Sequence, residues 1–236
     1  MKITVLFLFV GLSLTATAQK AKSTKTESML MTRGIGVSFQ KFDGLNSRIA
    51  VLPQYKALRD YMATLSLGSM NVRNNFISGI NITGGSSMSG DKGKRSSSLR
   101  FLSGSLYLGY DVIKGDKFML YPMVGFGGEG YQARFFKDNS AVNFNDVLTS
   151  GTTQNNIRPV IFKNMFGTYH AGIGFTVKPS TKSNGSIGIQ ASYTGSFKDK
   201  AWKSSDNQDL GNAPSDRLSR FQVGLVINSF PKFIKK

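Results

Sequence analysis

The sequence predicts an all-β fold, an eight-stranded antiparallel up-and-down transmembrane β-barrel. Three observations support this prediction: eight segments alternate apolar and polar residues with a period of two, the connections between them alternate between short and long, and the polar faces carry few charges. Alternation alone fits either a soluble barrel with its apolar face inward or a transmembrane barrel with that face toward lipid. The other two observations favour the membrane.

The alternating segments follow one another from residue 34 to residue 230. The clearest is GSIGIQASYTGSF, residues 185–197, which places Ile187, Ile189 and Tyr193 on one face and Ser, Gly, Gln and Thr on the other. Pro122 weakens the fifth segment, because proline removes a donor from the strand ladder. The segments expected to form strands are 34–42, 61–70, 76–86, 99–112, 118–132, 165–177, 185–197 and 220–230.

The connections after the second, fourth and sixth segments are short and contain Asn, Gly, Asp, Pro and Ser, the residues of tight turns. An even number of strands with tight turns at one end and long loops at the other is the layout of an outer-membrane barrel, which places both chain termini on the periplasmic side. The connections expected to be long loops are 43–60, 88–98, 135–164 and 198–218.

The composition of the two faces favours the same fold. A soluble core would leave the opposite faces rich in Lys and Glu, but these faces carry Ser, Thr, Gly, Gln and Asn. Small neutral polar residues suit the cramped interior of an eight-stranded barrel. Aromatic residues fall where two membrane interfaces would lie, as such girdles do: Tyr110, Phe118 and Phe230 near the periplasmic side, and Tyr61, Tyr193 and Phe197 near the outer side.

The ends of the chain predict export. Lys2 precedes an apolar run from residue 3 to residue 14, and Ala16 and Ala18 supply a small-residue cleavage pattern, so residues 1–18 are expected to be a signal peptide. A short periplasmic segment (19–32), the barrel (33–231) and a basic tail (232–236) follow. The chain has no cysteine, which excludes a lipoprotein anchor, a disulfide framework and thiol catalysis.

The charge is strongly basic, with 30 Lys and Arg against 13 Asp and Glu and a formal net charge of +17. An exported chain does not normally meet nucleic acid. The phosphate-rich lipid head groups of an anionic envelope surface attract Lys and Arg by the same Coulombic argument. The excess charge can equally serve only to keep the loops solvated.

The hairpin SLYLGYDVIKGDKFMLYPMVGFG, residues 105–127, and the closing strand RFQVGLVINSF carry a family resemblance. The chain resembles the small eight-stranded outer-membrane β-barrels of Gram-negative bacteria, the class that includes OmpX and the OmpA barrel. The resemblance implies a monomer surrounded by outer-membrane lipid and lipopolysaccharide. It also implies that barrel-insertion machinery reads an aromatic residue at the end of the last strand. Phe230 is the candidate, although PKFIKK follows it and Phe233 is the alternative.

Three lumen-facing residues, Glu129, His170 and Arg220, are expected to form a polar cluster in the outer half of the barrel. Since buried charges must be paired, a structural plug of hydrogen bonds accounts for them without a reaction. His170 is the only histidine, so it cannot build a His-rich metal site. In barrel deacylases of lipid A the serine follows two residues after the histidine, but here Ala171 and Gly172 follow. The sequence therefore predicts no catalytic residue, metal or cofactor.

The expected function is structural, or surface adhesion and partner binding through the long loops. The loop over residues 134–159 mixes Phe135, Phe136, Phe144 and Val147 with Asn, Asp and Thr, and loops on rigid scaffolds commonly carry recognition. A solvated loop without a partner is the plain alternative. Two other functions stay open: a secreted or periplasmic lipocalin-like barrel that binds an apolar ligand, and a lipid-A-modifying barrel enzyme. Eight strands enclose too little space for a wide porin channel.

Overall fold

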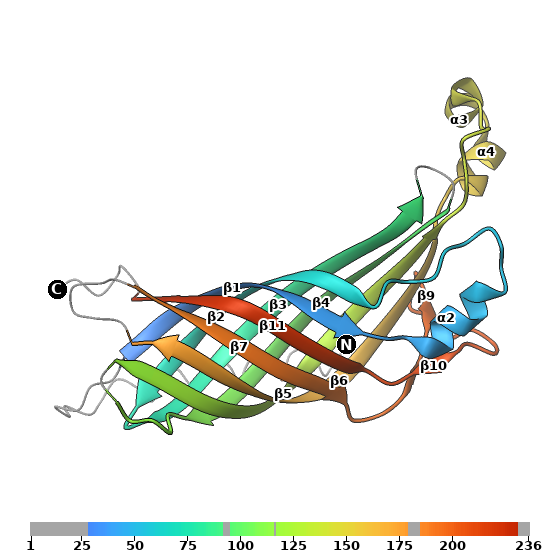
Figure 1. Cartoon of the computed structure of the whole chain (residues 1–236). Helices are drawn as coiled ribbons and strands as arrows, with labels where there is room; N and C mark the ends of the chain where they lie inside the picture. The colour runs from blue at the N-terminus through green and yellow to red at the C-terminus, as the bar shows by residue number, and fades with distance from the viewer. Residues whose placement is uncertain (1–27, 92–94, 116, 179–184, 231–236) are drawn as a thin grey trace.

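The computed structural model describes residues 28–91, 95–115, 117–178 and 185–230. The expected signal peptide and basic tail lie outside these residues. Most of the described chain is strand, wound into one barrel (Figure 1). The eight long strands are β1 (Ser28–Gln40), β2 (Tyr61–Arg73), β3 (Phe76–Asp91), β4 (Arg95–Tyr110), β5 (Phe118–Phe136), β6 (Val160–Val177), β7 (Gly185–Ser196) and β11 (Ser219–Ser229).

Each long strand pairs antiparallel with the long strands before and after it in the chain. The pairing of β1 with β11, which matches Ile35 with Leu225 and Val37 with Val223, joins the first strand to the last. The sheet therefore closes on itself and leaves no continuous free edge. The closed eight-stranded antiparallel up-and-down barrel predicted from the sequence is confirmed.

The strands extend further than the alternating pattern indicates, and the predicted loop over residues 88–98 is wrong. β3 and β4 remain paired through this stretch, with Ser87 opposite Leu99 and Gly90 opposite Ser96. The inward side chains there are buried, and Ser97 Oγ donates a hydrogen bond to the Ala57 carbonyl at 2.9 Å. This serine-rich stretch lacks apolar alternation, so its sequence gave no sign of the long hairpin.

The turn between β2 and β3 is tighter than the expected turn, residues 71–75. Only Asn74 and Asn75 lie outside the strands, and both have positive φ, 51° and 70°. Two consecutive left-handed residues make a type I′ turn, whose twist matches that of the flanking strands. Asparagine tolerates this conformation better than other non-glycine residues, which explains the pair.

The remaining elements gather at the end of the barrel opposite the tight turns (Figure 1). They come from three connections, 41–60, 137–159 and 197–218. No helix in the described ranges is long and apolar enough to cross a membrane. The helices are α2 (Asp43–Ala50), α3 (Phe144–Thr149) and α4 (Gly151–Asn156), and the short strands are β8 (Lys200–Ala201), β9 (Lys203–Ser204) and β10 (Ser215–Asp216).

Candidate functional site

The outer wall of the barrel is apolar. The faces predicted to carry the apolar residues point outward on all eight long strands, with exposed fractions of 67% for Leu65, 65% for Leu108 and 50% for Leu225. We call this surface the apolar belt; it runs on β5 from Phe118 to Gly130. A soluble protein rarely leaves so much contiguous apolar surface in water. The belt is therefore a surface suited to an apolar medium.

Aromatic pairs lie on the belt near both ends. Phe118 and Phe175 stack with ring centroids 5.6 Å apart near the tight turns. Tyr169 and Phe197 lie 5.5 Å apart toward the long loops. Aromatic side chains commonly gather at the two boundaries between the apolar band of a membrane barrel and water.

The lumen is polar and nearly full. Its walls carry Ser, Thr, Asn and Gln side chains, including Thr64, Thr83, Thr168 and Asn228, all buried. The central cavity has a volume of about 60 Å³, enough for only a few water molecules. A lumen of this polarity and size is the reverse of a lipocalin interior, which is apolar and large enough for a ligand.

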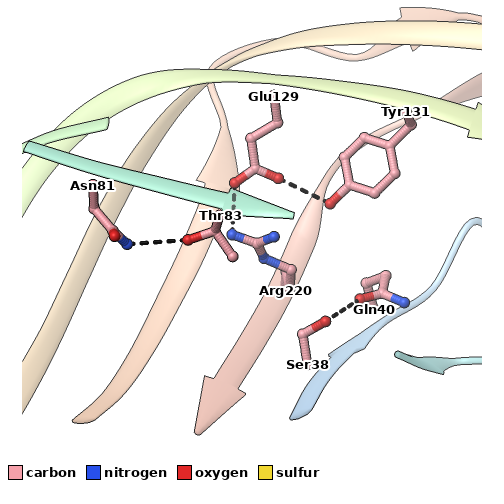
Figure 2. Close-up of polar contacts among 7 residues, drawn as sticks. All are labelled: Ser38, Gln40, Asn81, Thr83, Glu129, Tyr131 and Arg220. Atoms are coloured by element: carbon pink, nitrogen blue, oxygen red, sulfur yellow. Dashed lines mark hydrogen bonds and ion pairs between the residues drawn. The ribbon is translucent and has the colours of Figure 1, made fainter. Parts of the chain in front are cut away.

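A charged pair crosses this lumen at its outer end. Arg220 on β11 donates from Nη2 to Glu129 Oε1 on β5 at 2.7 Å, and Tyr131 donates from its hydroxyl to the other carboxylate oxygen at 2.9 Å (Figure 2). The exposed fractions of Glu129 and Arg220 are 1% and 4%. The Arg220 guanidinium also lies 4.3 Å from the ring centroid of Phe101. The carboxylate is thus held by two donors, and the cation lies over an aromatic face.

His170 lines the same cavity as Glu129 and Arg220 but takes no part in their hydrogen bonds. Its ring lies over the backbone of Gly125, the residue opposite it on β5, at a site that a side chain on β5 would fill. Within the described residues, no three His, Asp or Glu side chains are arranged to hold a metal ion. The structure therefore brings together two of the three predicted cluster residues and places the third beside them.

Sequence reasoning overlooked Tyr131 and Phe101, the two aromatic members of the network. Tyr131 follows Glu129 by two residues on β5, so its inward direction could have been read from the same alternation. Phe101 reaches Arg220 from β4, which no periodicity predicts, because contact across the lumen depends on the curvature of the whole barrel.

A buried apolar cluster lies at each end of the lumen. At the tight-turn end, Leu30, Met70, Ile77, Met119, Tyr121 and Met123 form one buried cluster. At the long-loop end, a larger cluster joins residues of the barrel to residues of the loops; its buried members are Phe42, Leu45, Ile49, Leu58, Met62, Leu99, Phe101, Tyr131, Ala133, Phe135, Phe166, Trp202 and Leu218. We call this second cluster the outer cap. The polar lumen therefore lies between two apolar clusters.

Asp216 fastens two loops within the outer cap. Its carboxylate accepts hydrogen bonds from the backbone amides of Gly44 and Leu45 at 2.7 and 3.0 Å, and from the indole nitrogen of Trp202 at 2.7 Å. The residue at the N-cap of α2 is Phe42, whose side chain has no oxygen that could accept from the first backbone amides of the helix, and Asp216 supplies this acceptor from a distant loop. Helix α2 is thereby tied to the connection between β7 and β11.

The longest described loop projects beyond the outer cap. Phe135, predicted to belong to a recognition loop, instead lies fully buried at the end of β5. The true loop, 137–159, carries α3 and α4 away from the barrel (Figure 1). Phe144 and Leu148, one helical turn apart on α3, have exposed fractions of 74% and 64%. They form an apolar pair at the far end of the molecule.

No family model matches this sequence, and no curated protein matches it. Among solved structures, Ail, the attachment invasion locus protein of Yersinia pestis, is similar with 14% identity and a TM-score of 0.49, over 87% of this chain and 99% of that chain. Neisserial surface protein A is similar with 7% identity and a TM-score of 0.47, over 88% and 100%. A major outer membrane protein from Thermus thermophilus has 10% identity and a TM-score of 0.44, over 84% and 99%.

Proposed function

We propose that this protein is an integral outer-membrane β-barrel that does not conduct solutes, and that it serves the structure of the envelope or contacts other molecules through its outer end. The apolar belt carries this proposal. It covers all eight strands, and on β5 it extends over 13 residues, from Phe118 to Gly130, which is long enough because a tilted strand needs about 9–11 residues to cross hydrocarbon. A closed barrel leaves no unpaired backbone groups in lipid.

The polar lumen also supports a barrel whose apolar face points outward to lipid. A lipocalin-like carrier needs an apolar cavity large enough for its ligand, typically several hundred Å³, but the cavity here is about 60 Å³ and is lined by residues such as Thr83, Gln190 and Arg220. The proposal includes no reaction, since the described residues around His170 supply no paired nucleophile. The surrounding lipid, including lipopolysaccharide, is the medium that the belt contacts.

Membrane fractionation followed by gel electrophoresis, with and without boiling, tests this proposal. We expect the protein in the outer-membrane fraction, with a mobility that changes when the barrel is unfolded by heat. A protein that remains in the soluble fraction without a heat-dependent mobility change contradicts the proposal.

Insertion into the membrane is proposed to depend on Phe230, which directly follows β11 and is 41% exposed. We expect Phe230→Ser to lower the amount of heat-modifiable protein in the outer membrane. The control is Phe197→Ser, which replaces an exposed aromatic residue at the other end of the barrel. Unchanged assembly of the Phe230→Ser variant would show that insertion does not depend on Phe230.

Contact with a partner is proposed to involve α3. Phe144 and Leu148 lie on one face of this helix, exposed to solvent, and an exposed apolar pair at the tip of a projecting loop is typical of recognition surfaces. Cells that produce the Phe144→Ser, Leu148→Ser double variant should adhere and aggregate less than cells that produce the unaltered protein. The matched control is Thr149→Ala, Thr152→Ala, which changes exposed polar residues of the same loop. Equal adherence of the two variants would remove α3 from the proposal.

A further inference from the structure

The apolar belt is hollowed at its outer edge. An open hollow of about 390 Å³ lies over β4, β5 and β6, and its lining includes Leu102, Gly130, Met165, Arg100 and Lys163. Leu102 on β4 and Met165 on β6 both pair with Gly130 on β5. Their side chains, with exposed fractions of 65% and 74%, form the two walls of the hollow, and the glycine lies between them. The hollow exists because the middle strand has no side chain at this position.

The next register row toward the tight turns, beside the hollow, also lacks side chains. Gly104, Gly128 and Gly167 are paired across β4, β5 and β6, and all three point outward. A Cβ atom added at Gly130 or Gly104 would have no neighbour within 4 Å, and neither glycine has the positive φ that would require glycine there. Neither backbone conformation nor crowding therefore requires glycine at these two positions, and the lack of a side chain leaves the space above them open.

The row on the opposite side of the hollow is cationic. Arg100, Gln132 and Lys163 are paired across the same three strands and point outward. Arg134 adds a second guanidinium, whose Nε donates to Gln132 Oε1 at 3.1 Å. Lys163 donates to the carbonyl of Ser205 and, with three donors on its ammonium, keeps others for a ligand. Successive outward rows lie about 7 Å apart, so these charges stand directly above the hollow.

Toward the tight turns, the glycine row is followed on the belt by the apolar row Leu106, Phe126 and Tyr169. An occupant must therefore be apolar where it meets the belt and anionic where it meets the basic row. A peptide from solution would have to enter through lipid to satisfy the first condition. A membrane lipid satisfies both, because a chain that lies against the belt would place its phosphate toward the basic row that contains Arg100 and Lys163.

We propose that this hollow binds one acyl chain of a phosphate-bearing lipid of the outer leaflet, with Arg100 and Lys163 holding the phosphate. The proposal rests on the outer-membrane insertion proposed above. The two glycine rows admit the chain against the backbone of β5, Leu102 and Met165 flank it, and the cations select lipids by charge. The barrel thus carries a specific lipid in addition to the lipids that surround it.

Native mass spectrometry of the full-length mature protein in detergent micelles tests the proposal, with bisphosphorylated lipid A and its enzymatically dephosphorylated form as the two probes. We expect one phosphorylated lipid to be retained, with a preference of about tenfold over the dephosphorylated probe. Gly130→Leu fills the hollow without backbone strain and should weaken retention of both probes about tenfold. Gly211→Leu, an equally uncrowded glycine in a loop, should bind as the unaltered protein does.

The double variant Arg100→Gln, Lys163→Gln leaves the hollow open and should remove the preference for phosphate. Its control, Arg48→Gln, removes an exposed charge from α2. Equal retention by Gly130→Leu and the unaltered protein, or equal retention of the two probes by the unaltered protein, would overturn the lipid site. Heat-dependent mobility is measured on every variant: a folded, membrane-inserted protein without lipid preference overturns this inference alone, whereas a soluble protein overturns the proposed function.

Discussion

Arg220 on β11 and Glu129 on β5 meet across the lumen at 2.7 Å, although they are 91 residues apart in the chain. The strands that carry them are not neighbours in the barrel. The pair therefore links two strands that are three apart in the ring of eight, and it is buried, with Phe101 of the outer cap against the guanidinium. We expect the pair to specify how these two strands face each other across the lumen.

Breaking this pair from one side should be more damaging than removing it. Arg220→Met leaves a buried carboxylate and Glu129→Gln leaves a buried guanidinium, so each should lower the free energy of unfolding by about 3–5 kcal/mol. The double variant removes both charges and should be less destabilised than the sum of the single variants. Urea unfolding in lipid vesicles measures all three; strictly additive losses would show that the two charges do not interact.

The outer cap should open when Asp216 is removed. Asp216→Ala deletes the acceptor of three hydrogen bonds, so we expect α2 and the Trp202 loop to separate at a cost of about 1–3 kcal/mol. Trp202 is the only tryptophan and is buried, which makes its fluorescence a direct report on the cap. The emission should shift to longer wavelength while the barrel keeps its heat-dependent mobility. Asp209→Ala changes an exposed carboxylate of the same loop and should leave the emission unchanged.

The barrel should not conduct ions across a lipid bilayer. Because an apolar cluster lies at each end of the lumen and the cavity between them is only about 60 Å³, we expect no continuous water path along the barrel. In planar lipid bilayers, the folded protein should therefore add no conductance steps to those of the lipid alone. Discrete, repeatable steps from a preparation shown to be fully folded would mean that at least one of these clusters opens.

Lipid A composition should not depend on His170. The residue is followed by Ala171 and Gly172 and lies against the backbone of Gly125. Cells that produce His170→Ala or Glu129→Gln should have the same lipid A as cells that produce the unaltered protein, after equal amounts of folded barrel are verified. A change in acylation confined to one of these variants would establish an enzyme and contradict the proposed function.

The sequence predicts the barrel well because the alternation of apolar and polar residues along a strand depends only on the surroundings of its two faces, lipid on one side and the lumen on the other. Leu65, Ile189 and Leu225 point outward as their parity requires. The register between strands leaves no such local trace, so the hollow between Leu102 and Met165 emerges only when β4, β5 and β6 are paired.

The outer cap is equally hidden in the sequence. Asp216 and Trp202 belong to irregular loop segments without periodicity, and the partners of Asp216 on α2 are more than 170 residues away. Contacts of this kind arise from tertiary packing of loops on the barrel. The β3–β4 hairpin was missed for a related reason: its serine residues are buried by the loops above it, not by an apolar face of their own.

The central claim is that the apolar belt contacts lipid, and the absence of cysteine from the sequence allows a direct test. Single cysteines at Leu65 and Ile189, on the belt, and at Thr152, in the projecting loop, can each carry a nitroxide label in vesicles. We predict that the labels at Leu65 and Ile189 are reached by oxygen, which partitions into lipid, and shielded from a water-soluble nickel chelate, with the reverse at Thr152. Labels at Leu65 and Ile189 that the nickel chelate reaches as readily as it reaches Thr152 would contradict the account.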